Sequence, residues 1–203
     1  MMKKILIIAA GILLVAAGVT VFLGRGHDLS QFEYLRNPQT RFMENQKVIV
    51  VEAKGDPEVV GGKAFSLLFR TYYKIKGAPK GPKQPAPRAR WPVELETKKI
   101  EWEGLYAMPV PLKTTELPIV KTEPGLTVRL DTWEYGQVAE ILHIGPYDRE
   151  KPTISRLIAF IKDNGYTIIG DHEEEYLKGP GMFSKGNPEK YYTIIRYRVK
   201  KAQ

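Results

Sequence analysis

The sequence predicts an α+β fold: two β-α-β-β modules in pseudo-symmetric tandem, with an antiparallel sheet and helices on one face, preceded by one transmembrane helix. Two observations carry this prediction. An uncharged apolar run extends from Ile5 to Leu23. After it, the order strand, breaker, helix, strand, strand occurs twice, with the breakers Gly55 and Gly145 ninety residues apart. A chain of 203 residues can bury a sizeable core. The absence of cysteine excludes disulfides, thiol catalysis and cysteine-ligated metals.

The amino-terminal run, residues 1–24, is predicted to be a membrane anchor. Its nineteen uncharged residues would span roughly 28 Å as a helix, close to the thickness of a bilayer core. A cleaved signal peptide, with a small-residue site at 16–18, is the alternative. The run continues to Leu23, which favours the anchor. Lys3 and Lys4 favour a cytoplasmic amino end, so we expect a single-pass membrane protein with its soluble part on the exported side, or a secreted protein if the segment is cleaved.

The rest of the chain divides by composition and pattern. Residues 25–45 are polar and mixed, and are interpreted as a juxtamembrane spacer. Residues 46–200 form the predicted soluble domain, with modules at about 46–112 and 126–200. The two modules share little sequence identity, so the repeat is one of pattern alone.

In the first module, the β-branched segment 48–51 predicts a strand and 55–57 breaks it. A Pro/Gly/Lys-rich loop is expected at about 77–87, followed by strands near 93–96 and 99–110. The helix between them is indicated by apolar residues at i, i+3, i+4 and i+7, which are Phe65, Leu68, Phe69 and Tyr72.

In the second module, segments 127–134 and 138–144 resemble a hairpin with Gly136 at its turn. A helix is predicted near 151–164, because Pro152 suits a first helical turn and Gly165 a C-cap. Its buried face should hold Ile154, Leu157, Ile158 and Ile161, and strands should follow near 166–177 and 191–200.

Charge and motifs exclude several functions. The formal charge is +8, and seven basic residues with no acidic ones lie between Arg70 and Arg90. This stretch is interpreted as a solvated loop or as a surface attracted to anionic lipids; no nucleic acid is expected as a partner. The chain has no phosphate-binding loop and no GxSxG motif. The histidines are not spaced as metal ligands, so neither a metal nor a cofactor is predicted.

Glu174 is the candidate for chemistry. Alternation along a strand places it on one face with His172 and Tyr176, while Glu173 and Glu175 face the other way. If the Glu174 face is concave, a carboxylate lies among aromatic rings. Such a group can hold a cation, act as a base, or simply pair with a basic residue at the rim.

Five segments carry a resemblance to a known family: His143–Asp148, Asn164–Tyr166, Glu174–Pro180 and Tyr191–Tyr197, and more weakly Trp102–Tyr106. Together they resemble the GyrI-like family, which includes the effector-binding domains of AraC-type regulators. The resemblance covers about residues 46–200, and no helix-turn-helix accompanies it.

The resemblance implies a small-molecule cleft between the modules, on the sheet face opposite the helices. Ligand-binding residues would be Glu174, Tyr176, Trp102, Tyr106 and Trp133, around a flat, lipophilic ligand, either neutral or cationic. The expected function is therefore a membrane-anchored binding module for such small molecules.

Two other functions remain open at this point. One is a hydrolase of cyclopropane-bearing or electrophilic xenobiotics, with Glu174 as general base and Tyr147 as a further catalytic residue. Ala107 follows Tyr106 where that group of the family commonly has a second aromatic residue. The other is a haem or tetrapyrrole binder, for which His143 would be the axial ligand.

Overall fold

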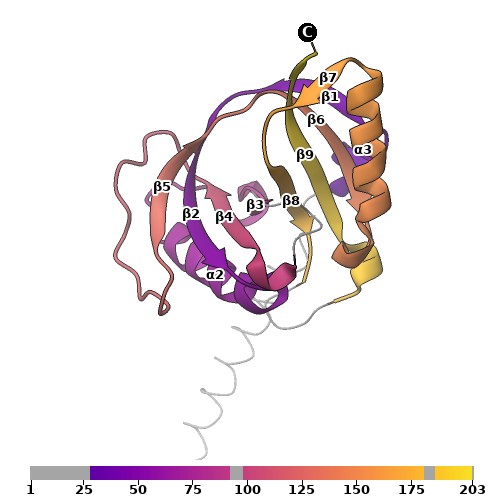
Figure 1. Ribbon diagram of the computed structural model, residues 1–203. Coiled ribbons are helices and arrows are strands. Elements are labelled where there is room, and N and C mark those ends of the chain that lie inside the picture. Colours follow the sequence, from indigo (N-terminus) through magenta and orange to yellow (C-terminus); the bar gives the residue numbers. More distant parts are fainter. Residues whose placement is uncertain (1–27, 92–97, 181–185, 203) are drawn as a thin grey trace, which may run out of the picture.

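The computed structural model describes residues 28–91, 98–180 and 186–202. Two α-helices and nine strands lie in these residues (Figure 1). The helices are α2 (Pro57–Tyr72) and α3 (Lys151–Asp163). The strands are β1 (Gln39–Met43), β2 (Gln46–Lys54), β3 (Arg88–Trp91), β4 (Glu103–Pro109), β5 (Val128–Trp133), β6 (Gly136–Ile144), β7 (Tyr166–Ile168), β8 (His172–Lys178) and β9 (Tyr192–Lys201). Short 3-10 helices are η1 (Leu29–Arg36), η2 (Gly81–Lys83), η3 (Lys99–Glu101), η4 (Tyr147–Arg149) and η5 (Pro188–Lys190).

The strands form one antiparallel sheet in the order β1-β6-β9-β8-β3-β4-β2-β5, and β7 pairs with β9. The first module contributes β2-β4-β3 and the second β6-β9-β8, so each module has its last strand in the middle. The modules join where β3 pairs with β8, with Ala89 opposite Glu174. The predicted α+β class and the repeated β-α-β-β order are confirmed, and the shared sheet makes the halves a single domain.

Both helices pack on the same face of the sheet. Asp56 caps α2 by accepting a hydrogen bond from the Glu58 backbone N–H at 3.0 Å, and Pro57 follows it. Leu67 and Leu68 of α2 are buried against β2, β3 and β4. On α3, Leu157 packs against β6 and β9. The predicted helices are confirmed.

One residue of the predicted α3 face lies outside the core. Ile154, Leu157 and Ile161 are buried, whereas Ile158 is 42% exposed. Ile158 follows Leu157 directly, so its side chain points about 100° further around the helix axis. It therefore lies at the edge of the buried face of α3.

The opposite face of the sheet is concave. The short connections between β1 and β2 and between β5 and β6 meet there, because the Tyr135 backbone N–H donates to Asn45 Oδ1 at 3.0 Å. Residues from β1, β2, β4, β5, β6 and the β5–β6 connection form a hydrophobic cluster across this face, namely Met43, Val48, Val50, Ala107, Trp133, Tyr135 and Val138. The sheet is therefore curled away from the helices, as Figure 1 illustrates.

The structure corrects two predictions about the edges of the domain. Residues 28–45, expected to be spacer, contain η1 and β1; β1 pairs with β6, and Leu35 of η1 is 1% exposed. Segments 127–134 and 138–144 are strands but not a hairpin, since β5 pairs with β2 and β6 pairs with β9. Gly136 does adopt a φ of 78°. A turn residue changes the direction of the chain but does not decide which strands pair. β5 lies at one end of the sheet and β6 lies near the other end, so the two strands are not neighbours.

The predictions for residues 1–24 and 93–96 concern segments outside the described residues. Within the described ranges, none of the helices has the length and apolar content needed to cross a membrane.

Candidate functional site

Glu174 occupies the centre of the sheet, on the helix-bearing face. Its exposed fraction is 8%. Three side chains donate hydrogen bonds to it: Trp91 Nε1 to Oε1 at 3.0 Å, Tyr176 Oη to Oε2 at 2.6 Å, and His172 Nε2 with Oε1 at 3.0 Å. Trp91 comes from the first module and the other two from β8. The carboxylate therefore lies at the junction that only the assembled sheet creates.

This location corrects the expectation that Glu174 and its aromatic neighbours lie on the face opposite the helices. The face of Glu174 and Tyr176 also carries Ile195, which packs under α3. Phe65 of α2 contacts Tyr176 from the other side, at 5.6 Å between ring centroids. Glu174 therefore sits in the seam between the two helices on the convex face. The alternation along β8 was predicted correctly, but alternation alone does not say which face the sheet curls around.

Aromatic rings enclose the carboxylate. Tyr176 meets Tyr147 at 5.6 Å, and Phe65 meets Tyr106 at 5.1 Å, in edge-to-face geometry. Trp91 contacts both Tyr106, at 5.6 Å, and Trp102, at 5.2 Å. Tyr147 is 37% exposed and forms the outer boundary. Four of the predicted aromatic residues therefore gather here, namely Tyr106, Trp102, Tyr147 and Tyr176.

Trp133, the fifth predicted aromatic residue, lies on the concave face. The guanidinium of Arg90 stacks over its ring, 4.0 Å from the centroid. Trp133 belongs to the hydrophobic cluster across that face. The sheet thus separates Trp133 from Glu174.

A second carboxyl group reaches the site from the start of α3. Glu150 is the residue before α3, yet its side chain makes no capping hydrogen bond. It is 5% exposed, and its Oε1 is buried without a hydrogen-bond partner among the described residues. Ligand atoms of Glu150, His172 and Glu174 all lie within 4.8 Å of one another. This trio has the donor types and spacing of a metal site, which the linear spacing of the histidines did not indicate.

The two carboxyl groups have pKa values displaced in opposite directions. Burial raises the pKa of Glu150 well above its usual range, and the charge of Glu174 adds to this. Burial also acts to raise the pKa of Glu174, but the hydrogen bond and charge interaction with His172 and the hydrogen bonds from Tyr176 and Trp91 outweigh it and leave that pKa lowered. The negative charge of the pair therefore favours Glu174 over Glu150.

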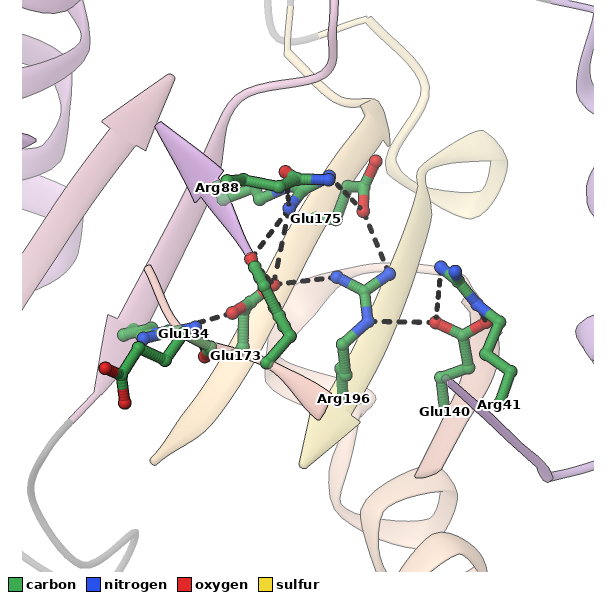
Figure 2. Close-up of polar contacts among 10 residues, drawn as sticks. Arg41, Arg88, Glu134, Glu140, Glu173, Glu175 and Arg196 are labelled. Carbon is green, nitrogen blue, oxygen red and sulfur yellow. Dashed lines mark hydrogen bonds and ion pairs between the residues drawn. The ribbon is translucent and has the colours of Figure 1, made fainter. Parts of the chain in front are cut away.

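The neighbouring carboxylates on β8 face a different environment. Glu173 and Glu175 point into the concave face, where Arg196 binds both and also Glu140, at distances of 2.7, 3.0 and 2.8 Å (Figure 2). Arg88 completes the network with an ion pair to Glu175 at 3.1 Å. Part of the basic stretch predicted to be a solvated loop is thus strand β3, whose arginines neutralise buried glutamates.

His143 does not have a free nitrogen for a haem iron. Its Nδ1 lies 3.0 Å from Thr153 Oγ1, and its Nε2 lies 3.2 Å from the carbonyl oxygen of Pro146. Burial lowers its pKa. These contacts show that His143 is a buried residue that connects β6 to the start of α3. Both of its ring nitrogens are engaged, so the axial ligand expected for haem binding is not free.

Four residues of the site were missed by sequence reasoning: Phe65, Trp91, Glu150 and His172 as a partner of Glu174. Phe65 was assigned only to a helix face, and Trp91 preceded the strand expected at 93–96. For His172, the available signal was its expected position on the same face of the strand as Glu174. For Glu150, the signal was a long acidic side chain at a helix start with no capping pattern around it.

The comparisons with known proteins identify the fold. No family model matches the chain, and no curated protein matches it significantly. Among solved structures, an uncharacterized conserved protein from Listeria innocua is similar, with a TM-score of 0.68, 24% identity, and coverage of 86% of this chain and 100% of that one. A hydrolase from Listeria innocua has a TM-score of 0.66 and 21% identity, covering 87% and 100%.

The EcmrR C-terminal domain is also similar, with a TM-score of 0.56 and 14% identity, covering 82% of this chain and 98% of that one. At these identities the likeness concerns the fold alone. It supports the GyrI-like fold that the sequence resemblance predicted.

Proposed function

We propose that this protein is a membrane-anchored module that binds small lipophilic cations at Glu174. The observation that carries the proposal is a buried carboxylate enclosed by aromatic rings and oriented by three hydrogen bonds. None of the three donors is a lysine or an arginine, so none carries a permanent positive charge. A cationic ligand would supply the missing positive charge.

The contrast along β8 supports this assignment. Glu173 and Glu175 are each paired with arginines in the concave face. Within the described part of the chain, Glu174 forms an ion pair only with His172, whose charge depends on protonation. A buried charge without a permanent counter-ion is costly for folding. Such a cost is consistent with a ligand-binding role.

The surrounding rings favour a flat or aromatic cation. Ring faces attract cations by about 0.5–2 kcal/mol each when water is excluded. The rings of Tyr106, Tyr147 and Tyr176 come from different elements, so a ligand that inserts among them touches both modules. Tyr147, at the exposed boundary, is the ring that must move to admit it.

The binding test compares two probes of similar shape and different charge. Full-length protein in a non-ionic detergent is titrated with tetraphenylphosphonium and with neutral triphenylphosphine oxide, following tryptophan fluorescence from Trp91 and Trp102. Glu174→Gln keeps the size of the side chain and removes its charge. We expect the cation to bind at least about tenfold more tightly than the neutral probe, and this preference to disappear in Glu174→Gln.

Glu189→Gln is the matched control, because Glu189 is an exposed carboxylate whose side chain is 62% accessible. It should leave cation binding unchanged. Equal binding of the two probes by the unmodified protein, or an undiminished preference in Glu174→Gln, would refute the proposal.

A hydrolase acting on an electrophilic xenobiotic is the second candidate. The observation that favours it is the neighbouring pair Glu150 and Glu174, since enzymes often use two carboxyl groups with separated pKa values as acid and base. Glu174 would accept a proton from water, and Tyr147 would orient the substrate. Turnover of a cyclopropane-bearing compound that is lost in Glu174→Gln would support it; intact binding with no turnover would favour the binding module.

The anchor belongs to the same proposal. Residues 1–24 would hold the domain at the membrane on the exported side, so that lipophilic ligands concentrated in the bilayer are close to the site. Alkaline carbonate extraction of membranes should leave the full chain in the pellet. Added protease should digest the domain from the exported side only. Release by carbonate would remove this part of the proposal.

A further inference from the structure

We propose that Glu150, His172 and Glu174 form a binding site for a divalent transition-metal ion such as zinc. The inference does not depend on the binding of organic cations. It rests on three ligand-type side chains that two distant segments bring together, the start of α3 and strand β8.

The spacing of the donor atoms suits a zinc ion. Ligand atoms at about 2.0–2.2 Å from zinc in a tetrahedron lie roughly 3.3–3.6 Å from one another. His172 Nε2 and Glu174 Oε1 are already 3.0 Å apart. Glu150 contributes an atom within 4.8 Å of both. Zinc binding would bring the Glu150 carboxylate closer to the other two donors.

The unsatisfied oxygen of Glu150 points independently to a ligand. Its Oε1 is buried and has no hydrogen-bond partner in the described ranges, although Glu150 is only 5% exposed. Buried polar atoms in proteins are almost always satisfied. The side chain also does not cap α3, which is its nearest alternative use. A metal ion between Glu150 and Glu174 would satisfy this oxygen.

The surroundings of the ligands resemble those that tune metal sites. In the structure Nε2 faces the Glu174 carboxylate as a donor, so metal binding would require the other tautomer of His172. Tyr197 Oη, 2.9 Å from Nδ1, can accept the Nδ1 hydrogen in that tautomer, which leaves the Nε2 lone pair for the metal. Trp91 and Tyr176 hold the Glu174 carboxylate in place from two sides. Three protein ligands leave a fourth position for water or a substrate.

The chemistry of the donor atoms narrows the choice of metal ion. One imidazole and two carboxylates favour zinc, manganese or ferrous iron over the softer copper(I), which prefers sulfur ligands. Zinc and cobalt(II) are therefore the probes. Cobalt(II) reports its coordination by its visible absorption.

The experiment uses the untagged full chain in detergent, so that no affinity tag supplies histidines. After removal of metals with a chelator, the protein is dialysed against zinc, and the bound metal is measured by mass spectrometry. Glu150→Gln removes a ligand charge while resembling the protonated carboxyl, so it should fold normally. His172→Gln removes the imidazole, and Glu189→Gln is the exposed control.

We expect a single zinc ion per chain, with affinity weakened about tenfold or more in Glu150→Gln and His172→Gln and unchanged in Glu189→Gln. Cobalt(II) should give the intense visible bands of a four-coordinate site, which both ligand variants lose. The absence of bound zinc, or binding that neither ligand variant weakens, would overturn the inference. A failure here would leave the tetraphenylphosphonium result intact, so the two proposals can fail separately.

Discussion

Replacing Arg196 by methionine should destabilise the domain strongly, because Arg196 connects the buried ion network of the concave face. Its side chain is 1% exposed. It donates to Glu140 at 2.8 Å, to Glu173 at 2.7 Å and to Glu175 at 3.0 Å (Figure 2). Methionine fills much of the same volume but leaves these three buried carboxylates with fewer donors.

The magnitude follows from what remains after the substitution. Three charge-assisted hydrogen bonds at about 1.5–3 kcal/mol each would give the upper limit of the loss. Each carboxylate keeps another arginine, however: Arg41 for Glu140, and Arg90 and Arg88 for the glutamates of β8. The expected loss is therefore about 3–5 kcal/mol, the usual cost of breaking a buried pair from one side. For a domain of this size that corresponds to a fall in Tm of about 6–20 °C.

The assay is urea and thermal unfolding of the full chain at neutral pH, with Arg198→Met as control. Arg198 lies on the same strand, but its contact with Glu134 is 4.0 Å long and Glu134 is exposed. Its other hydrogen bond goes to the backbone carbonyl of Tyr135 at 3.2 Å. Its loss should therefore cost less than about 1 kcal/mol. If Arg196→Met also costs less than about 1 kcal/mol, the network is hydrated and the reasoning from burial is wrong.

Two further predictions concern packing and pH. Gly104→Ala should destabilise the domain by about 1–3 kcal/mol in urea unfolding, because a Cβ there would lie 2.7 Å from both the Trp91 and Tyr106 rings. Gly62→Ala, with no atom within 4 Å of the new Cβ, should instead stabilise α2 by about 0.5–1 kcal/mol; the opposite order would contradict the packing argument. Burial acts to raise the pKa of Glu173 and Glu175, but the arginines outweigh it and hold both pKa values below the ordinary 4.5. A lowered folded-state pKa gives stability that is present above the ordinary value and lost as pH falls through the folded value. Glu150, whose pKa is raised, acts in the opposite sense above about pH 4.5. The unfolding free energy should therefore decrease as pH falls from about 4.5 to about 3, and an increase over that range would contradict the ion network.

The alternation of β8 illustrates what could be predicted locally. A strand places successive side chains on opposite faces, so the sequence correctly grouped His172, Glu174 and Tyr176 and separated them from Glu173 and Glu175. The direction in which the sheet curls depends on contacts between its distant edges, such as that of Tyr135 with Asn45. No local pattern encodes that direction, so the expectation that Glu174 faces away from the helices was wrong.

The composition of the site shows the same limit. Tyr106, Tyr147 and Tyr176 were predicted as a group, because the resemblance to a family supplied the long-range information. Glu150 was not, since its role depends on where α3 begins relative to β8 in space. Trp133 was predicted to join them, but its strand pairs with β2 and turns the ring towards Arg90.

The sequence by itself determined both helices, most of the strands, their repeated order and the residues that share a strand face, because these follow from periodicities of two and 3.6 residues. It missed β1 and β3, which lie in segments expected to be a spacer and a loop. It also predicted a small-molecule site centred on Glu174. Only the tertiary structure decided that Glu174 lies under the helices with Trp91 and Glu150, while Glu173 and Glu175 are neutralised by arginines. The physical reason is that solvation, charge pairing and hydrogen bonding depend on neighbours from distant segments. The residues of a strand determine which side chains share a face, but they do not determine which other segments pack against that face.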